Sequence, residues 1–134
     1  MQIKFQYFIP AIIWFIIIYI LLVMPSSDIP TFYFLDVIYF DKWVHAGLFG
    51  MQVILTCFPF FKSKYTSASF FFKITVLVIA YGVAMEFVQK YFTNGDRDFD
   101  VLDIAADAAG AVIGYLFIKA RFKKFTAKQE KAKK

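Results

Sequence analysis

Long apolar runs constrain the fold of this chain more than any other feature. They cover about residues 7–24, 43–60, 70–92 and 101–118, and each is long enough to cross a bilayer as an α-helix. The chain is 60% hydrophobic with a mean hydropathy of +0.62, which is more apolar than an ordinary soluble domain. The sequence therefore predicts an all-α fold, namely a four-transmembrane-helix bundle.

The connections between these runs carry turn residues and aromatic side chains. Pro25 and two serines follow the first run, and Asn94 and Gly95 separate the third run from the fourth. Residues 25–42 form the longest connection and are rich in Phe and Tyr, which are typical of the membrane–water interface. We therefore expect an aromatic interfacial segment between spans 1 and 2.

Basic residues gather on one side of the predicted bundle. Residues 119–134 hold eight Lys and Arg against one acidic residue, and the lysines at positions 4, 62, 64 and 73 belong to the same side. Because positively charged segments stay in the cytoplasm, we expect both termini to be cytoplasmic, with a single domain over residues 1–120 and a basic cytoplasmic tail over 121–134. Such a tail indicates attraction to anionic membrane lipids and does not indicate nucleic-acid binding.

Carboxylates inside the predicted spans are the second informative feature. Glu86, Asp103 and Asp107 lie within helices that should sit in lipid, where a charge costs roughly 2.5–3.5 kcal/mol at the bilayer centre. On the fourth helix a single stripe at spacings of 3 and 4 joins Asp100, Asp103, Asp107, Gly110 and Gly114. Its glycines form a small-residue pattern for close helix packing, so we expect the stripe to face other helices.

The polar residues of three spans should meet at one end of the bundle. With both termini inside, the start of the second span, the end of the third and the start of the fourth all lie at the outer leaflet. We therefore predict a polar outer-leaflet pocket. Its candidate ligand-binding residues are Asp41, Lys42, His45, Glu86, Gln89, Arg97, Asp103 and Asp107.

These residues carry a family resemblance. The sequence resembles the VanZ-like family of small bacterial membrane proteins over residues 38–116, and it departs from the usual pattern at Asp107, where the family commonly has Asn. The matching motifs are Asp41-Lys42-x-x-His45, Glu86-x-x-Gln89, Arg97 and Asp103-x-x-x-Asp107-x-x-Gly110-x-x-x-Gly114. The resemblance implies a multi-pass protein of the bacterial plasma membrane, linked to the cell envelope and to low-level resistance to teicoplanin, a glycopeptide antibiotic.

Four functional interpretations remain open at this stage. The polar residues could be an ion-paired network that only holds the helices together. They could bind a lipid headgroup, a lipid-linked cell-wall precursor or the antibiotic, and we favour this non-enzymatic role. In an enzyme that modifies a lipid-linked substrate, His45, Glu86 and Asp103 would be the catalytic candidates. A proton-coupled transporter is less favoured, because the inner halves of the spans lack charges apart from Lys73.

The same residues bear on metal binding and on assembly. His45, Glu86, Asp103 and Asp107 would supply one nitrogen and several oxygen ligands, which suit Zn²⁺ or Mn²⁺. No closely spaced ligand pair occurs, so the sequence alone predicts no metal and no cofactor. Gly110 and Gly114 could also face a second copy of the chain, which leaves a homo-oligomer open.

Overall fold

The computed structural model describes residues 3–25, 39–63, 66–93 and 98–131, and within these ranges the regular structure is entirely helical. The described residues form four α-helices, with bounds α1 (Ile9–Val23), α3 (Phe40–Cys57), α4 (Ala68–Phe92) and α5 (Val101–Lys131). Arg97 and most of the predicted aromatic segment, residues 26–38, lie outside the described ranges. The predictions made for them therefore stay predictions.

Prolines and capping side chains set several helix ends. Pro10 lies in the first turn of α1, where its missing N–H costs no helical hydrogen bond. Pro59 follows the end of α3 and belongs to a short 3₁₀ turn, η3 (Phe58–Lys62). The Ser67 hydroxyl accepts a 3.2 Å hydrogen bond from the Phe70 N–H at the start of α4. The Asp100 carboxylate accepts a 2.8 Å bond from the Leu102 N–H and caps α5.

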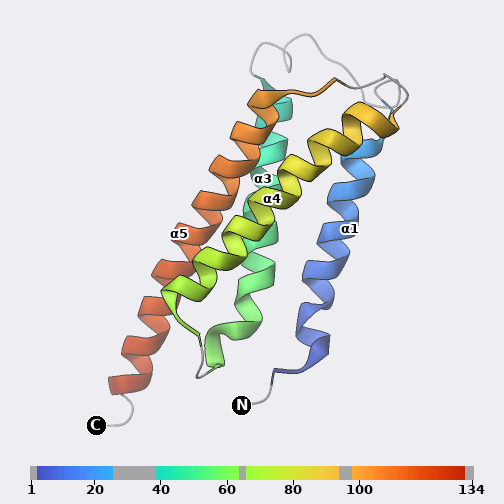
Figure 1. Cartoon of the computed structure of the whole chain (residues 1–134). Coiled ribbons are helices and arrows are strands. Elements are labelled where there is room, and N and C mark those ends of the chain that lie inside the picture. Colours follow the sequence, from blue (N-terminus) through green and yellow to red (C-terminus); the bar gives the residue numbers. More distant parts are fainter. Residues whose placement is uncertain (1–2, 26–38, 64–65, 94–97, 132–134) are drawn as a thin grey trace.

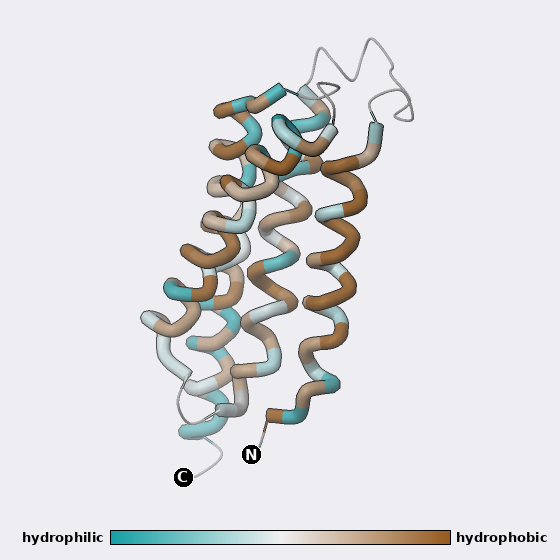
Figure 2. Tube along the Cα trace, turned by 45° about the vertical axis from the view of Figure 1, so that its right-hand side comes forward, coloured by the Kyte–Doolittle hydropathy of each residue, from teal (hydrophilic) through white to brown (hydrophobic). Residues whose placement is uncertain are grey.

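All four helices are long and apolar enough to cross a membrane, as Phe5–Val23, Phe40–Phe61, Ala68–Phe92 and Val101–Lys131. Hydrophobic residues cover most of α1 and the middle of the bundle, whereas hydrophilic ones gather toward its ends (Figure 2). The predicted spans agree within three residues, except that α5 continues well beyond residue 118. We describe the chain as a multi-pass membrane protein.

α3 and α5 are packed so closely that glycine is required between them. A Cβ at Gly110 would lie 2.6 Å from both the Cα and the carbonyl carbon of Ala46. A Cβ at Gly114 would lie 2.5 Å from the carbonyl oxygen of Gly50. These are backbone atoms of α3, so no rotamer change can make room. The two glycines therefore pack within the chain, against α3, and do not need a second subunit to explain them.

α4 crosses in front of α3, from beside α5 at one end of the bundle toward α1 at the other (Figure 1). Its first half packs Phe71 against Phe122 of α5, edge to face at 5.1 Å between ring centroids. Its second half reaches α1, where the Gln89 amide donates a 2.9 Å hydrogen bond to the Leu22 carbonyl. The indole N–H of Trp14 on α1 also donates to the Leu48 carbonyl of α3 at 2.9 Å.

Candidate functional site

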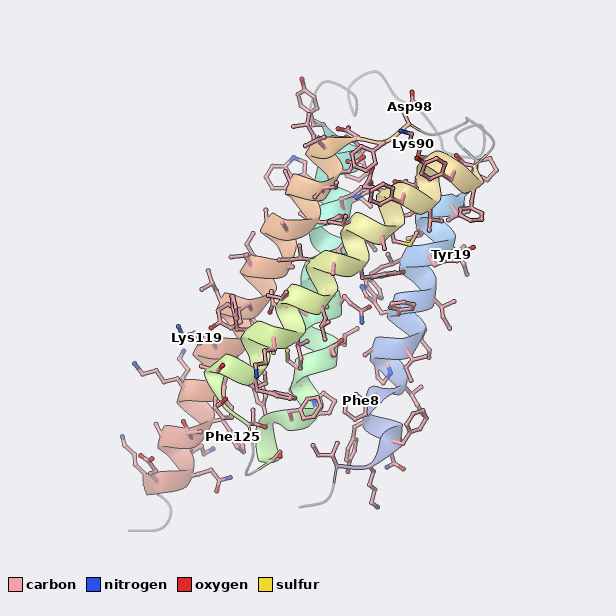
Figure 3. The ribbon with its side chains drawn as sticks, viewed as in Figure 1. Phe8, Tyr19, Lys90, Asp98, Lys119 and Phe125 are labelled. Atoms are coloured by element: carbon pink, nitrogen blue, oxygen red, sulfur yellow. The ribbon has the colours of Figure 1, made fainter. Side chains whose placement is uncertain are left out.

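The polar residues of three helices meet where α3 and α5 begin and α4 ends (Figure 1). This end of the bundle is opposite to the end at which α1 begins and α5 finishes. Asp98 and Lys90 lie at the polar end, whereas Lys119 and Phe125 lie toward the other (Figure 3). The side chains of the polar end form two layers, which we call the outer cluster (Asp41, Lys42, Asp100 and Asp103) and the inner cluster (His45, Glu86 and Asp107).

The outer cluster is built around one ammonium group. Nζ of Lys42 lies 2.5 Å from Oδ2 of Asp100, 2.6 Å from Oδ1 of Asp103 and 2.9 Å from Oδ2 of Asp41. Hydrogen bonding to Lys42 holds the pKa of Asp100 below the ordinary value of an aspartate. The side chains of Asp41 and Asp100 remain 60% and 40% exposed. The outer cluster is therefore accessible, and its lysine is already paired with three carboxylates.

The inner cluster is shielded from the surface. His45, Glu86 and Asp107 are 4%, 0% and 1% exposed. Nδ1 of His45 lies 2.9 Å from Oδ1 of Asp107, so the imidazole N–H donates to the carboxylate. Nε2 of the same ring lies 3.8 Å from Oδ1 of Asp103, which links the two clusters. The Asp107 carboxylate fits because position 82 is glycine: a Cβ there would lie 2.7 Å from Oδ2.

Glu86 joins α4 to the start of α5 but is only half satisfied. Its Oε2 accepts a 2.9 Å hydrogen bond from the backbone N–H of Asp100. Its Oε1 and the Oδ2 of Asp107 are buried without a hydrogen-bond partner among the described residues. An unsatisfied buried acceptor costs roughly 1–3 kcal/mol, and more when it is charged. The inner cluster therefore contains two buried carboxylate oxygens to which no described residue donates a hydrogen bond.

The structure separates one predicted ligand residue from the others. Gln89 is buried, but its amide bonds to the Leu22 carbonyl of α1 and so ties two helices together. The two clusters contain the six other predicted candidates that the structure describes, namely Asp41, Lys42, His45, Glu86, Asp103 and Asp107. Arg97, as stated above, is outside the described residues.

Asp100 is a site residue that the sequence-based candidate set did not include. It pairs with Lys42, caps α5 and donates its backbone N–H to Glu86. The signal was present, because Asp100 belongs to the acidic stripe of the fourth helix. Its position one residue before that helix is also the usual position of a capping aspartate.

A cleft at the opposite end of the bundle was also not predicted. It has a volume of about 790 Å³ and lies between the start of α1, η3 and the last turns of α5. Its lining includes three basic side chains of α5 and several aromatic side chains. The basic residues are Arg121, Lys124 and Lys128, and the aromatic ones include Tyr7, Phe58 and Phe125. The three basic residues are 3 and 4 positions apart, which places them on one face of a helix. This spacing is the sequence feature from which a basic surface on α5 could have been predicted.

The chemistry that the polar end can perform follows from its charges. Five described carboxylates (Asp41, Glu86, Asp100, Asp103 and Asp107) surround one lysine and one histidine. The site therefore favours cations and hydrogen-bond donors over anions. A histidine held by a carboxylate is also the arrangement of a general base and the group that orients it.

Comparison with known proteins adds no identification. No protein-family profile matches the chain, and neither a curated protein nor a solved structure shows significant similarity to it.

Proposed function

We propose that this chain is a VanZ-like protein of the bacterial plasma membrane that binds the polar end of an amphiphilic envelope molecule. The outer cluster is the proposed binding surface, and it faces the outer leaflet with both termini in the cytoplasm. The ligand class is a lipid headgroup, a lipid-linked cell-wall precursor or a glycopeptide of the teicoplanin type. Binding there lowers the sensitivity of the cell to teicoplanin.

The observation that carries the proposal is the partly exposed acidic outer cluster at the end of four apolar helices. The Lys42 ammonium group is already paired with three carboxylates, so it is not free to bind a phosphate group of a ligand. We therefore expect the outer cluster to bind an ammonium or hydroxyl group of the ligand. Binding at a helix end also suits an amphiphile, whose apolar part can lie along the exposed apolar faces of the helices.

Antibiotic susceptibility tests this function. In a susceptible bacterial host, expression of the wild-type chain should raise the inhibitory concentration of teicoplanin above that of an empty vector. Asp103→Asn removes a carboxylate of the outer cluster and should return the host to the empty-vector value. Asp98→Asn is the matched control, because Asp98 is an exposed aspartate at the same end of the bundle.

Membrane immunoblots should show equal amounts of all three proteins. The proposal fails if the wild-type chain gives no protection. It also fails if Asp103→Asn protects as well as the wild type does.

An acid–base enzyme is the second candidate, and the hydrogen bond between His45 and Asp107 favours it. Incubation of the purified protein with extracted envelope lipids would then give species of changed mass. His45→Gln should abolish their formation, and an unchanged lipid profile with the wild type would exclude turnover of those lipids.

The orientation has its own test. Lys and Arg are concentrated at the end of the bundle where α5 finishes, and this bias supports a cytoplasmic C-terminus. A reporter enzyme that is active only in the cytoplasm should be active when it is fused after residue 134. An inactive fusion would place the outer cluster at the cytoplasmic face and overturn the proposed location.

A further inference from the structure

The inner cluster has the composition and spacing of a metal site. His45, Glu86 and Asp107 each offer one ligand atom, and the three atoms lie within 4.8 Å of one another. In a tetrahedral site, ligand atoms about 2.1 Å from the ion lie about 3.4 Å from one another, so the most widely spaced of these atoms would move together by roughly 1 Å to bind one ion. The three residues come from α3, α4 and α5, so an ion here would join three helices.

Two unpartnered oxygens point independently to a ligand. Oε1 of Glu86 and Oδ2 of Asp107 are buried and accept no hydrogen bond within the described part of the chain. Both residues are at most 1% exposed. Oε1 of Gln52 is also unpartnered, but it belongs to a neutral amide, whereas these two oxygens belong to carboxylates. Buried carboxylate oxygens are expected to have a partner, which the described part of the chain does not supply.

The charges around the inner cluster favour a cation as that partner. Its two carboxylates face one histidine, which can carry at most one positive charge. Lys42, in the adjoining outer cluster, is already shared among three carboxylates. The positive charge of Lys42 is therefore neutralised locally and does not oppose a second cation below it.

We propose that His45, Glu86 and Asp107 bind a divalent transition-metal ion, with Zn²⁺ and Mn²⁺ as the best candidates. One imidazole nitrogen and carboxylate oxygens suit these ions, whereas Mg²⁺ and Ca²⁺ prefer oxygen ligands alone. The sequence offers these ligand types without a closely spaced pair, because each ligand is on a different helix, and only the fold brings the three together. Three protein ligands leave at least one coordination position for water or for a group of a bound molecule.

The proposal is tested on the purified full chain in detergent, without a metal-affinity tag. The protein is treated with a chelator, dialysed, and titrated with Zn²⁺ alone and with Mn²⁺ alone. We expect about one equivalent of metal per chain and a melting temperature that rises with metal concentration, because the ion binds only the folded state. Metal content is measured by mass spectrometry, and free Mn²⁺ by electron paramagnetic resonance.

Variants separate this site from incidental binding to carboxylates. Glu86→Gln keeps an oxygen for the Asp100 N–H but removes the charged ligand, and it should weaken binding at least about tenfold, since loss of even an outer partner weakens metal sites by about that factor. His45→Gln is the second variant, in case the first does not fold. Asp98→Asn, an exposed aspartate at the same end, should bind as the wild type does.

The inference is overturned if the folded wild type binds neither ion, whatever the variants do. It is overturned as well if Glu86→Gln or His45→Gln retains wild-type affinity, because the metal would then be adventitious. These measurements need neither antibiotic nor lipid, so their failure is distinguishable from a failure of the proposed binding function.

Discussion

Replacing Gly110 by alanine should open the contact between α3 and α5 and disturb the inner cluster. The added Cβ would lie 2.6 Å from the Cα and carbonyl carbon of Ala46, whereas carbon atoms in contact prefer about 3.5–4.0 Å. The obstacle is backbone, so relief requires the two helices to separate by roughly 1 Å. His45 precedes Ala46 by one residue, and Asp107 precedes Gly110 by three. Separating the two helices at Ala46 and Gly110 therefore also separates His45 from Asp107.

The magnitude follows from three contributions. A shift of roughly 1 Å would stretch the 2.9 Å contact between His45 and Asp107 beyond hydrogen-bonding range. Overpacking costs about 1–3 kcal/mol, and the lost hydrogen bond about 0.5–1.5 kcal/mol more. Alanine favours the helix over glycine by about 1 kcal/mol. The free energy of unfolding of Gly110→Ala should therefore fall by about 0.5–3.5 kcal/mol.

Gly47→Ala provides the matched control. Gly47 is an exposed residue of α3, and nothing lies within 4 Å of a Cβ placed there. The same substitution should therefore be neutral or stabilising by up to about 1 kcal/mol. Thermal unfolding in detergent, followed by circular dichroism, compares the two variants with the wild type. Equal melting temperatures for Gly110→Ala and Gly47→Ala would refute the reasoning.

Two further predictions concern the polar bonds between helices. Lys42→Met should lower the free energy of unfolding in detergent by about 1–2 kcal/mol, because Asp103 and its neighbours lose their shared cation. Lys90→Met, at an exposed lysine of the same end, should change this free energy by less than about 0.5 kcal/mol. Equal losses in the two variants would show that the ion pairs of Lys42 do not stabilise the fold. Trp14→Phe removes the indole donor to the Leu48 carbonyl and should lower the melting temperature by the equivalent of about 1 kcal/mol. An unchanged melting temperature would show that this bond does not hold α1 in place.

The helices could be predicted from the sequence because apolar length and turn residues suffice to define them. The exception is the end of α5, which continues to Lys131 although the apolar run ends near residue 118. Hydropathy marks where lipid ends, whereas a helix ends where the backbone is broken. Residues 119–131 contain neither proline nor glycine, so nothing in them stops the helix.

The sequence predicts which residues gather at the candidate site better than it predicts which of them contact one another. Three span ends at one face of the membrane had to bring their polar residues together, and Glu86, Asp103 and Asp107 are found in the two clusters. The separation of Gln89 from Glu86 was not predictable. Residues three apart on a helix differ by about 60° around its axis, so one can face α5 while the other faces α1. The rotation of α4 decides this, and rotation depends on packing.

The backbone contact between α3 and α5 also determines how this protein can diverge. At position 110 the obstacle is the main chain of Ala46, so no substitution at residue 46 can compensate for a larger side chain. At position 82 the obstacle is the carboxylate of Asp107, so residues 82 and 107 can change together. Among homologues we therefore expect glycine at 110 to be fixed, and residues 82 and 107 to covary in size.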